Sequence, residues 1–300
     1  MNGFGKSWYL ARWAFDTRVL RKHVPVNCSL ILTGKCNLAC KHCCVGEVAG
    51  NDPSFQDVKI SLRELYRTGA RYLAITGGEP ALWEDHSYRL ADVIECAREL
   101  GFFRVIVCTN GLQTLDIDAD YLWVSLDGDL EHHEQNRGRC YEKIVGNIEA
   151  SQHSRIYCNY TITRLNYLSF EHQVDAILRI KGMRGVLLHI FTPYVGADRS
   201  LLLEDTQRSE VLRRVLAYKL RHPFKVVNTL SAIRALISDR WPRPIWGSVT
   251  SWQNRLSECC CRDGLADDFT CRYCGSTVTV ETYAIQACKP LALLENLRFF

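Results

Sequence analysis

A regular alternation of short apolar runs and helical patterns most constrains the fold of this 300-residue chain. Branched apolar residues predict strands, and the stretches between and after them repeat with helical spacing. Strands that alternate with helices form parallel βαβ units with right-handed crossovers. We therefore predict an α/β fold, a partial (β/α)6 TIM-type barrel with a small cysteine-rich C-terminal extension. The predicted strands are 30–33, 72–76, 105–109, 122–126, 156–162 and 186–191, and the predicted helices are 54–68, 85–100, 141–151, 170–180 and 204–221.

The composition sets broad limits on the class of protein. With 47% hydrophobic residues, the chain can bury one large core, and its net charge of +4 is too mild to indicate a nucleic-acid partner. We divide it into an amphipathic N-terminal helix (1–24), a barrel (25–222) and a cysteine-rich region (223–300). The sequence lacks a run of eighteen apolar residues, so we expect no membrane-spanning helix.

The cysteines are numerous and unevenly placed. There are 15, and most gather at 36–44 and 259–288, while the others lie on predicted strands and helices. Disulfide scaffolds are typical of short secreted chains, and the N-terminus lacks the pattern of a secretory signal peptide. The two groups instead suit a reducing compartment in which proteins hold metal clusters. We therefore expect a cytoplasmic protein.

The N-terminal segment combines aromatic and basic residues at helical spacing. Trp8, Trp13 and Phe15 alternate with arginines as far as Arg21, and Pro25 ends the pattern. Such a helix can pack on the barrel with a solvated basic edge, which is the commoner arrangement. It can also lie on a membrane surface and contact anionic lipid. The sequence leaves both interpretations open.

Three cysteines follow the first predicted strand at C-x3-C-x2-C spacing: Cys36, Cys40 and Cys43. Thiolates are the ligands that iron–sulfur clusters prefer, and three of them on a four-iron cluster leave one iron open. An open metal position can bind and activate a small molecule. The alternative is three core cysteines by chance, because free cysteine is often buried. The neighbouring Cys44 is interpreted as a bystander.

Two further loops follow predicted strands and carry ligand-binding chemistry. Gly77-Gly78-Glu79-Pro80 follows the second strand, where two glycines allow close backbone approach and Glu79 offers a carboxylate. Ser125 and Asp127 follow the fourth strand, and a polar loop with His132, His133, Arg137 and Gly138 comes next. In parallel barrels the chemistry lies on such loops. Ordinary Asx or Ser turns are the alternative for Ser125 and Asp127.

Together, the Cys36–Cys40–Cys43, Gly77–Pro80 and Ser125–Asp127 motifs resemble those of the radical S-adenosylmethionine superfamily over roughly 29–196. The resemblance implies a [4Fe–4S] cluster on the three cysteines and S-adenosylmethionine on its fourth iron. It implies that the Gly77–Pro80 turn receives the methionine ammonium and that Ser125 and Asp127 meet the carboxylate or ribose. An external one-electron donor would reduce the cluster, and a 5′-deoxyadenosyl radical would attack the substrate.

The resemblance leaves two positions of the site less defined. The residue before Cys43 is commonly aromatic in this superfamily, and His42 occupies that place, where its ring would pack by the adenine. His189, on the sixth predicted strand, is left without a role, and no catalytic residue is assigned. The substrate is a peptide, a lipid or a small metabolite.

The second cysteine group is similar to the auxiliary-cluster extensions (SPASM or twitch type) of radical enzymes. It has Cys259, Cys260 and Cys261 and then Cys271, Cys274 and Cys288, with an alternating stretch (276–285) predicted as a hairpin. We expect a second [4Fe–4S] cluster on Cys271, Cys274, Cys288 and one of the triplet, with Cys261 preferred. A zinc ion bound by the same cysteines is the alternative. The pattern departs from the extensions at Tyr283, where a glycine is expected.

A different class of function competes with the radical enzyme. The same cysteines suit a non-catalytic iron–sulfur or zinc protein that acts as a scaffold or electron carrier. That alternative predicts no cleavage of S-adenosylmethionine.

Overall fold

The computed structural model describes residues 3–43, 52–259 and 265–296. Its main sheet has eight strands in the order β10-β9-β1-β2-β5-β6-β7-β8, and a separate hairpin pairs β3 with β4. The strands are β1 Asn27–Ile31, β2 Tyr72–Thr76, β3 Glu84–Asp85, β4 Tyr88–Arg89, β5 Arg104–Thr109, β6 Tyr121–Ser125, β7 Ile156–Ile162, β8 Met183–Ile190, β9 Ser248–Trp252 and β10 Arg255–Glu258. The helices are α1 Gly3–Arg18, α2 Phe55–Arg67, α3 Leu90–Leu100, α4 Leu130–Arg137, α5 Tyr141–Ala150, α6 Phe170–Arg179, α7 Asp205–Arg221, α8 Leu230–Ser238, α9 Asp268–Arg272, α10 Thr277–Gln286 and α11 Pro290–Asn296, with short 3-10 turns at Pro80–Leu82 and Arg199–Leu201.

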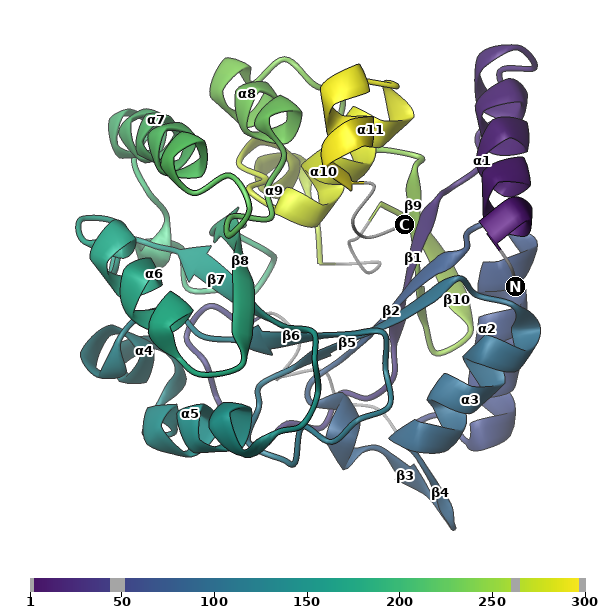
Figure 1. Ribbon diagram of the computed structural model, residues 1–300, viewed down its shortest axis with the longest axis horizontal. Helices are drawn as coiled ribbons and strands as arrows, with labels where there is room; N and C mark the ends of the chain where they lie inside the picture. The colour runs from purple at the N-terminus through teal and green to yellow at the C-terminus, as the bar shows by residue number, and fades with distance from the viewer. Residues whose placement is uncertain (1–2, 44–51, 260–264, 297–300) are drawn as a thin grey trace.

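The predicted partial barrel is confirmed. All six predicted strands are present, lie side by side in chain order and pair in parallel. Figure 1 shows the sheet curved into an arc, with α2 to α6 around its outer face and α8 to α11 in the opening. The loops that follow the strands therefore share one edge of the sheet, as the barrel architecture requires.

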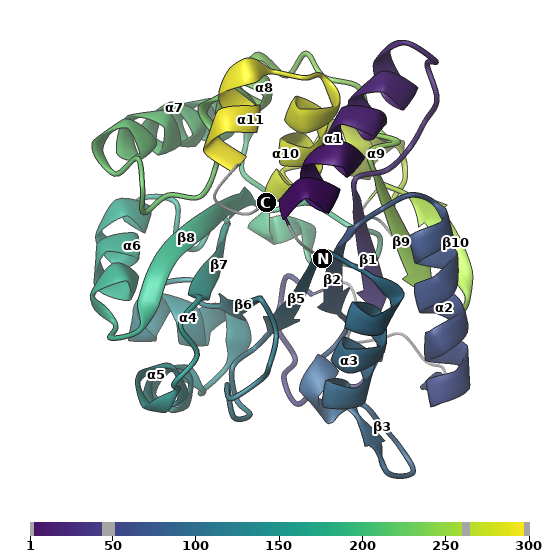
Figure 2. The same ribbon diagram turned by 45° about the vertical axis from the view of Figure 1, so that its right-hand side comes forward.

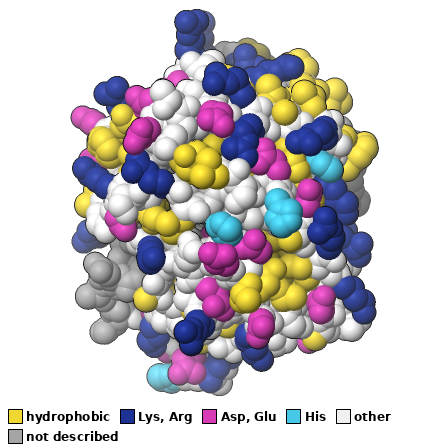
Figure 3. All heavy atoms as spheres, turned by 90° about the vertical axis from the view of Figure 1, so that its left-hand side faces the viewer, with side chains coloured by type: hydrophobic (Ala, Val, Ile, Leu, Met, Phe, Trp, Pro, Cys, Tyr) yellow, Lys and Arg dark blue, Asp and Glu magenta, His cyan; other side chains and the backbone are white. Residues whose placement is uncertain are grey.

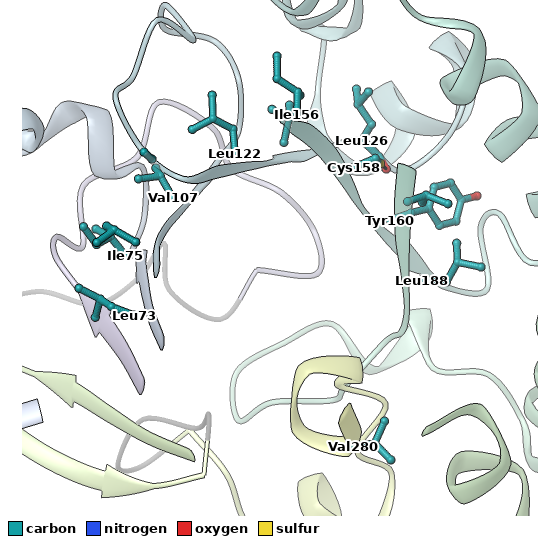
Figure 4. Packing of buried hydrophobic residues seen from close by; sticks show 14 of the residues in the cluster. Leu73, Ile75, Val107, Leu122, Leu126, Ile156, Cys158, Tyr160, Leu188 and Val280 are labelled. Carbon is teal, nitrogen blue, oxygen red and sulfur yellow. Dashed lines mark hydrogen bonds between the residues drawn. The ribbon is translucent and has the colours of Figure 1, made fainter. Parts of the chain in front are cut away.

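The core lies between the sheet and the outer helices. Leu73 and Ile75 on β2 and Val107 on β5 are fully buried, with Leu62 of α2 against the same cluster. Figure 4 shows Leu73, Ile75 and Val107 among the packed side chains of neighbouring strands. Each such side chain contributes about 1.5–3 kcal/mol through removal from water. This packing fixes the strand ends that carry the loops.

Local sequence explains where α2 begins. Ser54 accepts a hydrogen bond from the Asp57 amide (3.2 Å), and the Asp57 carboxylate accepts one from the Ser54 amide (3.2 Å). This capping box satisfies two donors that a helix start leaves unpaired. The predicted start of α3 at residue 85 is wrong, because residues 84–89 form the β3–β4 hairpin instead.

The N-terminal helix α1 is docked on the barrel. Trp13 is buried and donates to the carbonyl oxygen of Val24 (2.8 Å), and Tyr9 donates to that of Gly69 (2.9 Å). Its other side leaves Trp8 and Phe15 exposed, at 63% and 53%. Figure 2 shows α1 beside α11, and Leu293 of α11 packs in the same small cluster as Trp13. The helix thus has an anchored side and an exposed aromatic side.

The chain beyond Arg221 departs from the sequence prediction. The alternation of helix and strand continues past the last predicted helix (204–221), since α8 is followed by β9, which pairs in parallel with the free edge of β1. The alternating stretch before Cys288 is the helix α10, not a hairpin. Threonines explain the difference. The hydroxyls of Thr277 and Thr282 donate to the carbonyl oxygens of Leu188 and Val278, so both side chains are buried, whereas the alternating pattern implied that they face solvent from a strand.

The described surface is mixed in character. Figure 3 shows one face of the molecule, the left-hand side of Figure 1, where α4 to α7 lie. Basic and acidic side chains alternate there, with hydrophobic groups scattered among them. Among the described helices, none is both long and apolar enough to cross a membrane.

Candidate functional site

The first cysteine group lies on the loop that leaves β1. Cys36, Cys40 and Cys43 are half-buried, and none of them forms a disulfide. A turn brings the Cys43 amide to the carbonyl oxygen of Cys40 (3.0 Å), and the Lys41 amide donates to the carbonyl oxygen of Asn136 (2.9 Å). The loop is therefore held from the α4 side of the barrel mouth. Cys44 lies outside the described residues.

The glycine turn after β2 packs directly on the cysteine loop. The Gly78 amide donates to the carbonyl oxygen of Thr33 (2.8 Å), and the Glu79 amide donates to that of Lys35 (2.7 Å). A Cβ atom on Gly78 would overlap the Lys35 backbone, so only glycine permits this approach. Pro80 is buried and starts the following 3-10 turn. The two loops thus form one backbone unit.

The carboxylate of Glu79 is held by donors from two neighbouring loops. It is fully buried and accepts from the Thr109 hydroxyl (2.8 Å), the Asn110 amide (2.6 Å) and the Ala81 amide (3.1 Å). Burial raises its pKa, against these hydrogen bonds. The Asn110 side chain in turn donates to Asn37 (2.7 Å) and lies 3.8 Å from the Cys36 sulfur. Glu79 therefore supports the cysteine loop through Asn110, and its carboxylate is not exposed to an ammonium group.

The carboxylate of Asp127 is likewise buried, and it holds Arg137. It accepts from Arg137 Nε (2.5 Å), Asn136 Nδ2 (2.8 Å) and the Thr161 amide (2.9 Å). Burial alone would raise the pKa of Asp127, but the Arg137 charge, His42 and the hydrogen bonds from Arg137 and Thr161 together outweigh it and hold the pKa at about 2. Asp127 is therefore an ionised anchor for Arg137, with no surface for direct contact with a ribose or a carboxylate.

Arg137 connects this anchor to the cysteine loop. Its Nη1 lies 3.8 Å from the Cys40 sulfur, and its Nη2 lies 3.3 Å from His42 Nε2. The other ring nitrogen of His42 lies 2.9 Å from Asn136 Oδ1. Burial, and then the Arg137 charge, lower the pKa of His42, so the ring is neutral, with Nδ1 as donor to Asn136. The sequence singled out Arg137 only as part of a polar loop; that loop is α4, whose first turn is capped by Asp129.

These groups surround a cavity of about 270 Å³ at the C-terminal ends of β6, β7 and β8. Ser125 and Thr161 supply hydroxyls to its wall, His42 and Arg137 close one side, and Phe191 lies on the other. Hydroxyls, a guanidinium and aromatic surface in one cavity suit a ligand that has both a polar end and a flat ring. The structure thus brings His42 and Ser125 together with the cysteine loop.

The second cysteine group is divided. Cys259 lies near Cys271 and Cys274 and interacts electrostatically with both; burial, more than this neighbour, raises the pKa of Cys274 to about 11. Cys288 lies at the other end of α10, a ten-residue helix that is about 15 Å long. There its sulfur lies 3.1 Å from Arg18 of α1. The expected ligand set of Cys271, Cys274 and Cys288 thus spans both ends of α10 and remains a prediction, and Cys260 and Cys261 lie outside the described residues.

The three thiols of the first loop have the donor chemistry of an iron–sulfur cluster. Within the described ranges, no three Cys, His, Asp or Glu side chains converge as they would on one metal ion. A four-iron cluster instead gives each thiolate its own iron. Three half-buried thiols, an adjacent cavity and the neighbouring Arg137 and Asn110 donors match that requirement.

The family model described as the radical SAM superfamily matches residues 30–180, which is half of the chain. The chain therefore belongs to the radical S-adenosylmethionine superfamily. The sporulation killing factor maturation protein SkfB of Bacillus subtilis is 29% identical over 130 residues, covering 40% of this chain and 30% of that protein. Pre-heme d1 synthase of Dinoroseobacter shibae is 28% identical over 202 residues, covering 61% and 47%. The match to each relative spans less than half of its length.

Solved structures share the fold at low identity. SuiB of Streptococcus suis superposes with a TM-score of 0.54 at 17% identity, covering 75% of this chain and 54% of that one. The anSMEcpe structure with bound AdoMet and a Cp18Cys peptide gives a TM-score of 0.56 at 13% identity, covering 91% and 99%. At such identity the likeness extends to the fold alone.

Proposed function

We propose that this chain is a radical enzyme that holds a [4Fe–4S] cluster on Cys36, Cys40 and Cys43 and binds S-adenosylmethionine in the adjoining cavity. The observation that carries the proposal is the convergence of three thiols, the glycine turn and the Arg137–Asp127 pair at one cavity wall. The bound cluster and S-adenosylmethionine would together supply a 5′-deoxyadenosyl radical that abstracts hydrogen from a substrate. The reaction would be of the oxidoreductase or transferase type.

Different residues of the chain would contact different parts of S-adenosylmethionine. The Gly77–Pro80 turn offers backbone carbonyl oxygens to the ammonium, because its Gly78 and Glu79 amides already bond the cysteine loop. Ser125 meets the polar end of the ligand, and His42 packs by its adenine. Asp127 is a positioning residue that keeps Arg137 directed at the Cys40 and His42 side. An external one-electron donor is required.

A second metal centre on the C-terminal cysteines extends the proposal. Cys259, Cys271 and Cys274 supply three sulfurs, and Cys260 or Cys261 supplies the fourth, so Cys288 is released from the set. A [4Fe–4S] cluster is favoured over zinc because the chain is proposed to carry one cluster already. This region (223–300) would then act as an auxiliary-cluster extension of the SPASM or twitch type behind the barrel of 25–222, in a cytoplasmic protein.

The exposed side of α1 supports a weaker proposal, contact with anionic lipid. Trp8, Phe15 and Val19 are exposed beside Arg12 and Lys22, an arrangement that suits a membrane interface. Liposomes that contain phosphatidylserine should pellet more of the full chain than of a chain without residues 1–22. If the full chain and the chain without residues 1–22 pelleted equally, the proposed contact with lipid would be excluded.

The test of the main proposal is production of 5′-deoxyadenosine. Anaerobically reconstituted protein, reduced with dithionite, should cleave S-adenosylmethionine, and about eight irons per chain should be present. A fully loaded protein that never forms 5′-deoxyadenosine would favour the scaffold or electron-carrier alternative.

A further inference from the structure

The inner face of the sheet carries small side chains where a filled barrel carries large ones. Ser29 on β1 pairs with Ala74 on β2 in the strand register, and Cys108 on β5 lies two residues beyond Ile106, the β5 partner of Ala74. Parallel barrels are normally filled at this level by branched side chains. Here the small residues leave a chamber inside the arc, on the β-strand side of the C-terminal helices.

The chamber is a second cavity, of about 170 Å³. Its walls are mainly apolar, and they include Ile106, Trp123, Leu187 and Val227 from the barrel and Ile285 from α10. A cavity of about 150 Å³ holds one benzene ring, so the chamber suits one ring or a short branched aliphatic group. Among its described lining residues, only Glu281 of α10 is charged.

Asn159 of β7 joins the chamber to the S-adenosylmethionine cavity, because it lines both. The Thr277 amide donates to His189 Nδ1 (3.2 Å), which leaves His189 Nε2 as donor to Asn159 Oδ1 (3.4 Å). The Asn159 side chain also hydrogen-bonds Cys108. These contacts fix Asn159 at the boundary between the two spaces. The two cavities therefore adjoin at Asn159.

Glu281 selects the kind of group that the chamber accepts. Its two oxygens accept from the amide (2.6 Å) and the hydroxyl (2.7 Å) of Thr229, which ties it to the start of α8. Each oxygen keeps a further lone pair that can face the chamber. Above its pKa of about 7, the Glu281 carboxylate attracts a nitrogen donor at this wall and repels an anion, while Glu295 behind it is paired with Lys219 (3.1 Å).

We propose that the chamber is the substrate site, and that it takes a compact, mainly apolar group of about one ring that carries a nitrogen donor and no negative charge. This inference deepens the proposed function and rests on it. The group can belong to a small metabolite or to a side chain of a peptide, and the two sources share this chemistry.

The experiment measures binding by calorimetry on the anaerobically loaded protein with S-adenosylmethionine present. At pH 8, where Glu281 is ionised, indole and benzylamine should bind, and benzoate should bind at least about tenfold more weakly because of Glu281. Comparison of free indole with a pentapeptide that carries one central tryptophan distinguishes the two sources, and tighter binding of either supports the chamber. Failure of indole, benzylamine and the peptide to bind would overturn the proposal.

Variants locate the binding. Ala74→Leu and, on the neighbouring strand, Ser29→Val fill the chamber and should weaken indole binding by about tenfold or more. Ala91→Leu, on the exposed face of α3, is the matched control and should leave binding unchanged. Glu281→Gln should reduce the difference between benzylamine and benzoate. Equal indole binding by Ala74→Leu, Ser29→Val and Ala91→Leu would place the probe elsewhere and refute the inference.

Cleavage of S-adenosylmethionine separates this inference from the proposed function. The filled variants should still produce 5′-deoxyadenosine with dithionite in the absence of substrate, which shows that they fold and load the cluster. If wild type binds indole but never cleaves S-adenosylmethionine, the radical function fails and the chamber loses its role as a substrate site. If wild type cleaves S-adenosylmethionine but binds no probe, only the chamber assignment fails.

Discussion

The two cysteine groups of this chain look alike in the sequence and differ in the structure. Cys36, Cys40 and Cys43 lie on the single loop that follows β1, so their close spacing in the sequence brings them to one place. Cys274 and Cys288 are separated by a helix, and that helix carries Cys288 to α1. Spacing therefore defines a site when the intervening chain is a loop, and it fails when an element of unknown type intervenes.

The largest expected effect tests the first group. Replacement of Cys36, Cys40 or Cys43 by alanine should remove about four irons per chain and reduce 5′-deoxyadenosine formation by about a thousandfold or more, because the open-iron cluster is lost. Iron analysis and product assay measure this. Cys96→Ala, on α3, is the matched control and should retain both. Retention of cleavage by any of the three variants would break the assignment.

The next effect concerns the anchor that supports the first group. Asp127→Ala should lower the free energy of unfolding by about 3–5 kcal/mol, because it leaves the buried Arg137 without its partner. Urea denaturation measures the change. The exposed Arg98–Asp118 pair provides the control, and Asp118→Ala should cost about 1 kcal/mol or less. Similar losses in both variants would contradict the role given to burial.

A pH-dependent effect is expected where the C-terminal helices meet the barrel. Burial, opposed by the Thr229 hydrogen bonds, raises the pKa of Glu281 to about 7 from its usual 4.5. A raised carboxyl pKa favours the folded state fully below pH 4.5, and that contribution is lost as the pH rises through about 7. The loss is on the order of 2 kcal/mol. Denaturation of wild type at pH 5 and pH 8 should show it.

Glu281→Gln should remove this difference between pH 5 and pH 8, because glutamine does not titrate in this range, its amide oxygen can accept from the Thr229 amide, and its nitrogen can donate to the Thr229 hydroxyl. An unchanged pH dependence in this variant would assign the effect to another group.

The smallest expected effect concerns Cys288 and compares the two ends of α10 directly. Cys288→Ala should leave the metal content unchanged, whereas Cys274→Ala should lose the second centre and keep some cleavage of S-adenosylmethionine. Iron and zinc analysis of the two variants checks this. Loss of metal in Cys288→Ala would restore the ligand set that the sequence spacing favours.

Local periodicity explains why the barrel was predictable. The six strands and the loops after β1, β2 and β6 follow from short apolar runs and glycine-rich turns, which are signals within a few residues. The element α4 was missed because every residue after Leu130 in it is polar, although Asp129 caps its first turn. The helix α10 was missed because its threonines imitate strand alternation, although Thr282 bonds within the helix and Thr277 bonds to β8.

The roles of Glu79 and Asp127 depend on contacts that sequence spacing does not encode. Both were predicted to meet the ligand, and both carboxylates are buried against partners on other loops: Asn110 for Glu79 and Arg137 for Asp127. A buried carboxylate with three donors supports a site from behind. The role of Arg137 is indicated by its burial at the end of the short helix α4, and that burial is visible only in the fold.

The pairing of β9 with β1 has a consequence for how the chain must be made. Asn27 pairs with Ser248, so the strand that leads to the first cysteine loop acquires its second neighbour only when the last sixth of the chain is present. Until then, one side of β1 presents unpaired amides and carbonyls, which are a template for pairing with other chains. During synthesis, or after loss of the C-terminal segment, the cysteine-bearing strand is therefore an aggregation-prone edge.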